Sequence, residues 1–97
     1  AENTITQLGG FTAFTSADDI SLDYGISGAD VTTVSFTKQI IKRAIRVVFV
    51  GTINKFDRGA LYKIADLSDL DYIITNADPG EKWQKFAAEN NIQLMYP

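Results

Sequence analysis

The sequence contains neither cysteine nor histidine. These absences exclude disulfides, a thiol nucleophile, the usual structural zinc sites and any Ser-His or Cys-His catalytic pair. Histidine is also the only side chain whose unperturbed pKa lies near neutral pH. Acid–base chemistry would therefore fall to Asp, Glu, Lys or Tyr with a shifted pKa.

Basic charge and long apolar runs are also scarce. The formal net charge of −3 argues against this chain alone binding a nucleic-acid backbone. No apolar run approaches the roughly 20 residues of a membrane span, and the first ten residues lack the basic and apolar regions of a signal peptide. We therefore expect a cytoplasmic protein with no membrane contact.

The 97 residues have the composition of one soluble domain. Hydrophobic residues make up 45% and charged residues 22%, and no repeat or linker divides the sequence. The first third predicts a strand over residues 4–8, the opening of a short helix over residues 16–19 and a strand over residues 22–26. Residues 27–30 are rich in turn formers.

The remainder alternates between helical and extended patterns. A helix is predicted from Ser35, with its apolar face formed by Phe36, Ile40, Ile41 and Ala44. Residues 47–50 form a continuous apolar run followed by Gly51, which predicts a strand buried on both faces. A second buried strand is predicted over residues 71–75, with Ser68 capping a helical turn before it.

A last helix and strand are expected near the end of the sequence. Asp78 is a suitable N-cap, Pro79 suits the first helical position, and Glu81 follows three residues after the cap. Trp83, Phe86 and Ala87 would form the buried face, and a strand would follow from Ile92. This alternation predicts an α/β domain with a mainly parallel sheet and flanking helices.

Ligands of such sheets bind at the carboxyl ends of the strands. The predicted strands place these ends after Leu8, Val50 and Ile74. At the same places the sequence is similar to a known family. The segments that carry the similarity are a "KRA" helix, an apolar strand, an "SKF"-like loop and a "D-x-I-I-T-D"-like strand, at residues 41–45, 46–50, 54–61 and 67–76, with earlier landmarks at residues 8–10, 22–24 and 28–30.

Over most of residues 5–96, and most strongly over 41–76, the chain resembles the C-terminal domain of the DeoR family of bacterial transcriptional regulators. The resemblance implies a Rossmann-like fold related to ribose-5-phosphate isomerase and CoA-transferase-type domains. It also implies a sensor of a phosphorylated sugar within a repressor of carbohydrate-metabolism genes. DNA would be bound only through a helix-turn-helix domain that these residues do not contain, and residues 1–97 would be the C-terminal part of the sensor domain. We expect a homo-oligomer, because an uncovered sheet edge invites pairing.

The sequence departs from the family pattern at three acidic positions. Lys38 stands where the family usually has a Glu, while Thr52 and Asn76 each stand where it usually has an Asp. Three carboxylates thus become one cation and two neutral groups, which bears directly on contacts with sugar hydroxyls.

Lys55 leads the candidate ligand-binding residues, because a lysine after a buried strand can meet a phosphate with three donors. Asn54 and Thr52 would supply neutral hydrogen bonds, and Thr75 lies at the next strand end. The backbones of Gly9, Gly10 and Gly28 could approach an anion closely, because glycine has no side chain. Asp30 is placed to bind a sugar hydroxyl. The plainer alternatives are a solvated surface lysine, tight turns and a turn-forming Asp.

No catalytic residue, metal site or cofactor is predicted. Asp66, Asp69 and Asp71 lack the spacing and central glycine of a calcium loop. A basic cluster consists of Lys38, Lys42, Arg43 and Arg46. It could suggest nucleic-acid binding, but the exposed side of an amphipathic helix explains the cluster more simply. Two other functions stay open: an aldose–ketose isomerase with Asp30 as base, and an oligomerisation module that binds no ligand.

Overall fold

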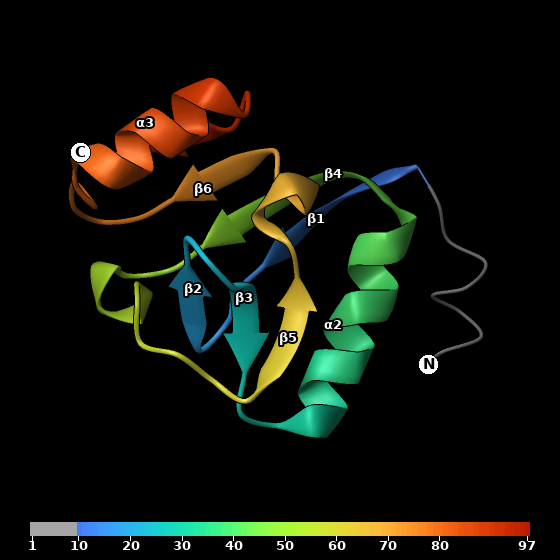
Figure 1. The fold of residues 1–97 in the computed structure, drawn as a ribbon. Coiled ribbons are helices and arrows are strands. Elements are labelled where there is room, and N and C mark those ends of the chain that lie inside the picture. The colour runs from blue at the N-terminus through green and yellow to red at the C-terminus, as the bar shows by residue number, and fades with distance from the viewer. Residues whose placement is uncertain (1–9) are drawn as a thin grey trace.

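A parallel sheet forms the framework of the computed structural model, which describes residues 10–97 (Figure 1). Its strand order is β1-β4-β6-β7, and each neighbouring pair is parallel. The strands are β1 (Phe11–Thr15), β4 (Ala44–Val50), β6 (Tyr72–Ile74) and β7 (Gln93–Met95). The expected α/β class with a mainly parallel sheet is therefore confirmed, whereas the strand predicted over residues 4–8 lies outside the described residues.

A smaller antiparallel sheet packs beside the parallel one. It has the order β2-β3-β5 and consists of β2 (Asp19–Ser21), β3 (Gly25–Gly28) and β5 (Tyr62–Ala65). The helix α2 (Val31–Arg43) runs along β5, and α3 (Glu81–Glu89) lies at the other end of the molecule against β7 (Figure 1). Two short 3-10 turns, η1 (Ile53–Lys55) and η2 (Leu67–Asp69), follow β4 and β5.

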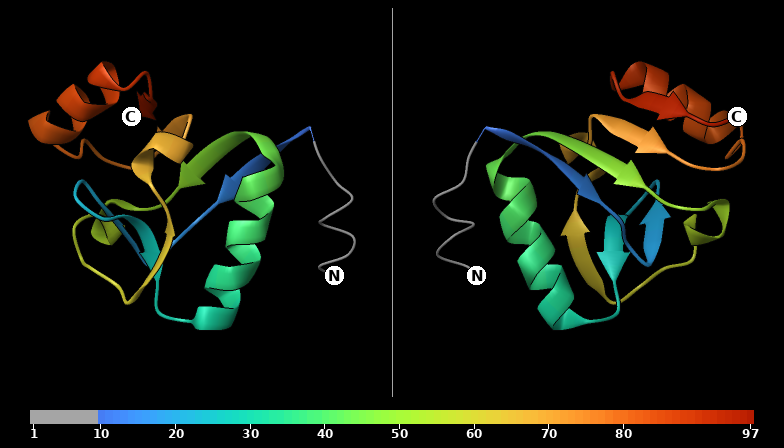
Figure 2. Two further views of the ribbon diagram at one scale, coloured as in Figure 1. Left: turned by 45° about the vertical axis from the view of Figure 1, so that its right-hand side comes forward. Right: turned by 180° about the vertical axis from the view of Figure 1, so that it is seen from behind.

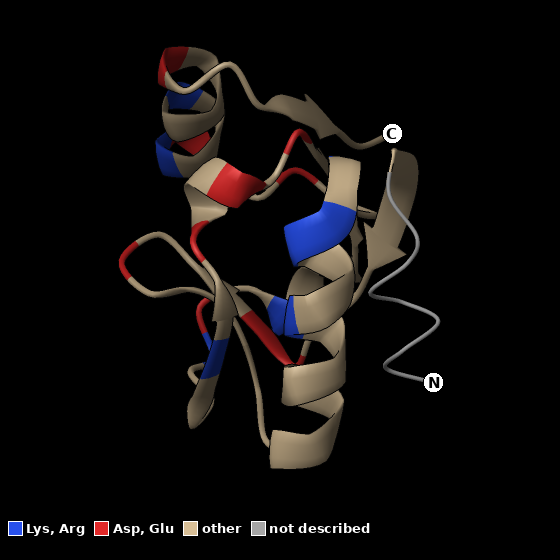
Figure 3. Ribbon diagram, turned by 90° about the vertical axis from the view of Figure 1, so that its right-hand side faces the viewer, with Lys and Arg blue, Asp and Glu red and all other residues tan. Residues whose placement is uncertain are grey.

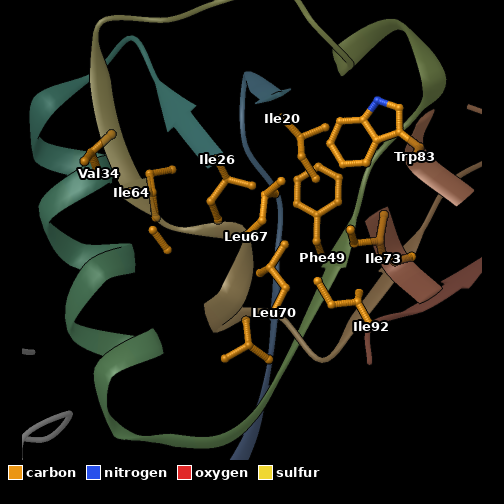
Figure 4. Close-up of a cluster of buried hydrophobic side chains, with 13 residues drawn as sticks. Ile20, Ile26, Val34, Phe49, Ile64, Leu67, Leu70, Ile73, Trp83 and Ile92 are labelled. Carbon is orange, nitrogen blue, oxygen red and sulfur yellow. The ribbon is translucent and has the colours of Figure 1, made fainter. Parts of the chain in front are cut away.

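The hydrophobic core fills the space between the two sheets and the two helices. Figure 4 shows side chains from both sheets, η2 and α3 converging on Phe49, which is fully buried. Phe49, Phe56 and Trp83 form a chain of edge-to-face ring contacts, with centroids 6.5 Å and 4.9 Å apart. The chain joins β4, the loop after η1 and α3, so the loop that carries Lys55 is anchored to the core.

The predicted helix opening at residues 16–19 is wrong, because both acidic side chains bond to distant backbone. Asp18 Oδ2 accepts the Ala29 amide at 2.9 Å. Asp19 is fully buried in β2, and its Oδ1 accepts the amides of Arg58 and Gly59 at 2.6 and 2.7 Å. These tertiary hydrogen bonds outweigh the local tendency of Ser and Asp to start a helix.

The helix α2 begins earlier than predicted, and the predicted apolar face is only partly correct, since Ile41 and Ala44 pack against the core. Asp30 caps it through a hydrogen bond from the Thr33 amide at 3.1 Å. Val34 is buried, while Phe36 is 42% exposed and does not belong to the core. The predicted strand over residues 22–26 is likewise shifted, since residues 22–24 form the turn between β2 and β3.

Two predicted caps also differ from the structure. The last helix is capped by Gly80, which has a φ of 107°, and the Asp78 carboxylate instead accepts the Gly80 amide at 2.9 Å. The turn η2 is capped by Asp66 and Asp69 rather than by Ser68. In each case the helical element is present, but its N-cap is a residue other than the one predicted.

The strand β4 is buried on both faces over Val47, Val48 and Phe49, as predicted, but not at its last residue. Val47 and Phe49 point into the core, but Val50 is 43% exposed. Both α2 and α3 and the antiparallel sheet pack on the same side, so the other side of the parallel sheet faces the viewer uncovered in the right-hand view of Figure 2. Val48 is buried beside Phe14 and Tyr72, its partners in register on the adjacent strands.

Candidate ligand-binding site

Polar side chains gather at the carboxyl edge of the parallel sheet, where β1, β4 and β6 end. They line an open cleft of about 490 Å³, here called the edge cleft, whose residues are Ser16, Val50, Gly51, Thr52, Lys55, Ile74, Thr75 and Asn76. Three predicted site residues, Lys55, Thr52 and Thr75, therefore meet in one cavity. They come from different loops because parallel strands place all their carboxyl ends at the same edge.

A second cavity adjoins the first at Lys55 and Ser16. This side cleft, of about 390 Å³, lies between β3 and the first turns of α2 and is lined by Ser16, Ala17, Asp18, Gly28, Asp30, Thr33, Val34, Thr37, Lys55 and Ile64. It contains the predicted residues Gly28 and Asp30. Lys55 thus lies between a neutral cleft on one side and a cleft with two carboxylates on the other.

Lys55 is held in place through its backbone, while its ammonium group forms no ion pair with the part of the chain that the structure describes. The Lys55 amide donates to the Thr52 carbonyl at 3.0 Å, which closes η1. Asn76 Oδ1 accepts the Ile53 amide at 2.8 Å and ties η1 to the end of β6. Within residues 10–97 no carboxylate lies within ion-pair distance of Lys55. A half-buried lysine on a fixed turn with no anionic partner is suited to receive an anion.

The hydroxyl of Thr75 is an unsatisfied polar group in the wall of the edge cleft. Thr75 is 6% exposed, and its Oγ1 has no hydrogen-bond partner among the described residues. A buried hydroxyl without a partner costs roughly 1–3 kcal/mol, and such groups are rare in folded proteins. A ligand oxygen or amine in the edge cleft would remove this penalty.

Carboxylates of the side cleft hold the turn between β3 and α2. Asp30 Oδ2 accepts both the hydroxyl and the amide of Thr33, and these bonds lower the pKa of Asp30 below its ordinary value of 3.8. Asp18 binds the Ala29 amide from the other side of the turn. At neutral pH Asp30 is therefore a charged acceptor, with oxygen capacity to spare for a hydroxyl group.

The remaining predicted residues occupy different positions. The Thr52 hydroxyl donates to Asn54 Oδ1, so the Asn54 side chain bonds within the turn and lies outside the lining of either cleft. Gly28 allows close packing, since a Cβ there would lie 2.9 Å from Val34 Cγ2. Gly10 lies before β1, at the amino end of the sheet, and the structure does not bring it to the cleft. Gly9 lies outside the described residues.

Sequence reasoning missed Ser16, Asp18 and Thr33 as lining residues. Ser16 directly follows β1, and the signal for it was the alternation of Phe11, Ala13 and Thr15, which belong to a strand that the sequence analysis did not assign. Asp18 and Thr33 reach the side cleft only because β2 and β3 fold back beside α2, which no local pattern indicates.

Basic positions of α2 lie opposite acidic positions of the segment around η2 in Figure 3, and a separate groove lies between the two segments. Lys38 and Lys42 line it from α2, while Asp69 and Asp71 line it from the segment around η2. Asp71 Oδ2 accepts the Val47 amide at 2.8 Å. The mixed charge of this groove does not favour a nucleic-acid backbone, which requires a basic surface.

Two classes of site find no support in the described residues. In residues 10–97 no three His, Cys, Asp or Glu side chains are grouped so that they could hold a metal ion. Over the same range, neither helix is long and apolar enough to cross a membrane.

The chain is similar to a known protein family. The model of a family described as the DeoR C terminal sensor domain matches residues 1–77. The match includes both clefts up to Asn76, and it ends before α3 and β7.

Proposed function

Because this chain belongs to the DeoR C terminal sensor domain family, whose domains sense ligands for DeoR-type transcriptional regulators, we propose that it binds a phosphorylated sugar across the edge and side clefts. The chain would bind this ligand for the regulator and would not convert it chemically. The observation that carries the proposal is the position of Lys55, which has no ion pair within residues 10–97 and lies between a neutral cleft and a carboxylate-lined cleft.

The phosphate belongs in the edge cleft. Lys55 supplies a cation there, and the unsatisfied hydroxyl of Thr75 supplies a donor. Among residues 10–97 no carboxylate lines this cleft, since Asn76 and Thr52 stand where the family usually has Asp. Charge-assisted hydrogen bonds to phosphate are roughly twice as strong as neutral ones. With a neutral lining, no carboxylate repels the phosphate that these bonds attract.

The sugar hydroxyls belong in the side cleft. Asp18 and Asp30 are acceptors at its rim, and Thr33 and Thr37 add hydroxyl groups. A carboxylate would repel a phosphate at this end, so the charge pattern gives the ligand one orientation. The anionic end points to the sheet edge and the polyol end points to α2.

An isomerase is less well supported than a sensor. Moving a proton next to a carbonyl requires a base whose pKa lies near the working pH. The hydrogen bonds from Thr33 instead lower the pKa of Asp30, which makes it a poor base. The third alternative, a module that binds nothing, does not explain the unsatisfied hydroxyl of Thr75 in the cleft wall.

The remaining parts of the proposal follow the family resemblance. We assign the fold to the Rossmann-like group related to ribose-5-phosphate isomerase and CoA-transferase-type domains, and residues 1–97 to part of the sensor domain of a cytoplasmic repressor. The repressor would control carbohydrate-metabolism genes and would contact DNA through a helix-turn-helix domain that these 97 residues do not contain.

Ligand-induced thermal stabilisation tests the proposal, because a ligand that binds only the folded state raises Tm. A panel of sugar phosphates, the parent sugars and inorganic phosphate separates the two ends of the ligand. We expect at least one sugar phosphate to raise Tm more than its parent sugar and phosphate together, with no product formed on incubation.

Two charge-reversed variants provide the matched comparison. Lys55→Glu should abolish the stabilisation, while Lys85→Glu, an equal charge change on the exposed side of α3, should leave it intact. Equal responses of the two variants would show that Lys55 does not bind the anion. Product formation from a hit would replace the sensor with an enzyme.

A further inference from the structure

A groove of about 640 Å³ lies between the second half of α2 and the segment around η2, and it is here called the α2 groove. Its floor is apolar and consists of Val47 of β4 with Ile64 and Ala65 of β5, all of which are buried. Cavities of roughly 300–1,000 Å³ with an apolar lining and a few polar groups are typical of small-molecule sites. The α2 groove therefore has the size and the floor of a binding site.

One wall of the α2 groove is cationic. Lys38 and Lys42 lie one helical turn apart on α2, so both side chains are on the face that lines the groove. Within residues 10–97 neither lysine forms an ion pair or a side-chain hydrogen bond, and α2 itself contains no acidic residue. Because Lys38 stands where the family usually has a Glu, this pair of cations belongs to this chain rather than to the family pattern.

The opposite wall is anionic and fixed by the backbone. Asp69 Oδ2 accepts the Asp66 amide at 3.1 Å, and Asp71 Oδ2 accepts the Val47 amide at 2.8 Å. In the described part of the chain, the second oxygen of each carboxylate has no hydrogen-bond partner. A carboxylate accepts several hydrogen bonds, so both aspartates can still bind a donor in the groove.

The two walls do not neutralise each other. Figure 3 shows basic positions of α2 opposite acidic positions around η2, yet among residues 10–97 no lysine of this wall lies within ion-pair distance of an aspartate of the other. A ligand with a single charge would be attracted by one wall and repelled by the other. A ligand with both charges is attracted by both walls.

We propose that the α2 groove binds an apolar zwitterion, which is a molecule with a free ammonium group, a free carboxylate and an apolar body. The carboxylate binds the two lysines, the ammonium group binds the two aspartates, and the apolar body covers the floor. A free apolar amino acid and a short apolar peptide share this chemistry. The charged residues of the α2 groove line neither the edge cleft nor the side cleft, so this inference does not depend on the proposed function.

The apolar body of the ligand is required by the lining. Ile45 lines the α2 groove and is 70% exposed, so an apolar side chain of the ligand removes its surface from water. Covering apolar surface is favourable, whereas a ligand without a side chain leaves Ile45 and the floor hydrated. The groove therefore distinguishes leucine from glycine.

Amide NMR titrations of the 97-residue chain with leucine and with leucyl-leucine, each up to about 10 mM, test the proposal. Shifts should involve Lys42, Val47 and Asp69. The compound that binds more tightly identifies the source of the ligand as a free amino acid or as a peptide. No binding of either compound, or shifts confined to Thr52 and Thr75 in the edge cleft, would overturn the proposal.

Three analogues of leucine test the three parts of the ligand. Leucinamide lacks the carboxylate, N-acetylleucine lacks the ammonium group, and glycine lacks the apolar body. Each should bind about fivefold or more weakly than leucine, since an exposed ion pair contributes up to about fivefold in Kd. Ribose 5-phosphate carries no ammonium group and should not displace leucine. An analogue that binds as tightly as leucine, or displacement by the sugar phosphate, would contradict the assignment.

Two variants of the walls have matched controls on α3. Lys38→Glu and Asp69→Asn should each weaken leucine binding about fivefold or more, and the asparagine keeps an oxygen for the Asp66 amide. Lys85→Glu and Glu89→Gln make the same charge changes at exposed positions of α3 and should bind like the native chain. Circular dichroism verifies that each variant folds, and the analogue series needs no variant. Equal binding by the wall variants and their controls would show that the α2 groove is not the site.

Discussion

Replacing Asp19 with alanine is expected to destabilise the chain severely and to loosen the loop that follows η1. The fully buried carboxylate accepts the amides of Arg58 and Gly59 on one oxygen and the Ser27 hydroxyl on the other, at 2.6, 2.7 and 3.2 Å. Removing it leaves two loop amides without an acceptor.

The size of the effect can be worked out from these bonds. Hydrogen bonds to a charged group contribute about 1.5–3 kcal/mol each. The two short ones therefore give about 3–6 kcal/mol, and partial relaxation of the loop reduces this to about 3–4 kcal/mol. A domain of this size has a free energy of unfolding of only about 5–15 kcal/mol, so Tm should fall by roughly 12–25 °C.

Chemical denaturation gives the free energy of unfolding, and amide hydrogen exchange gives the local effect. Asp19→Asn serves as the control, because its amide oxygen still accepts both loop amides; we expect a loss of only about 1–2 kcal/mol. In Asp19→Ala the amides of Arg58 and Gly59 should exchange far faster than in the native chain. A loss below about 1 kcal/mol, or unchanged exchange at these two amides, would refute the reasoning.

Three further substitutions test the site. Thr75→Val removes the unsatisfied hydroxyl and should raise the free energy of unfolding, measured by denaturation, by about 1 kcal/mol. It should also weaken phosphate binding, measured by calorimetry, and a destabilised variant would contradict the assignment. Asn76→Asp retains the acceptor for the Ile53 amide but adds an anion near Lys55, so affinity for a sugar phosphate should fall about tenfold or more with little change in Tm. Asp30→Ala should lower the free energy of unfolding at pH 7, because the folded state depresses the pKa of this carboxyl. The difference from the native chain should shrink as the pH falls through 3.8 and vanish below the folded pKa. A series of denaturation curves at different pH values would measure this.

The parallel sheet was predictable because its signals are local. The apolar run at Val47, Val48 and Phe49 forms a buried part of β4, and the second run forms β6, in which Ile73 is buried and Ile74 half-buried. The rule that parallel strands end at one edge then led from Val50 and Ile74 to Thr52, Lys55 and Thr75. Their presence in one cleft agrees with that reasoning, while their roles in binding stay predictions.

The antiparallel sheet was not predictable, because its residues have the composition of turns. Asp19, Gly25 and Gly28 occur in strands of three or four residues, and each is fixed by something distant in the sequence. Asp19 binds the backbone of residues 58 and 59, and a Cβ on Gly25 would lie 2.2 Å from the Ala65 carbonyl oxygen. No window along the chain contains these partners, so local patterns predicted a helix opening over residues 16–19 and a single strand over residues 22–26 in place of β2 and β3.

The edge-to-face contact between Phe56 and Trp83 also makes the cleft observable. Trp83 is the only tryptophan of the chain, and its ring lies 4.9 Å from the ring of Phe56, the residue next to Lys55. Any displacement of that loop when a ligand arrives alters the surroundings of one buried indole. Intrinsic fluorescence at a single emitter can therefore follow occupancy of the cleft in real time, without a label and without a change to the sequence.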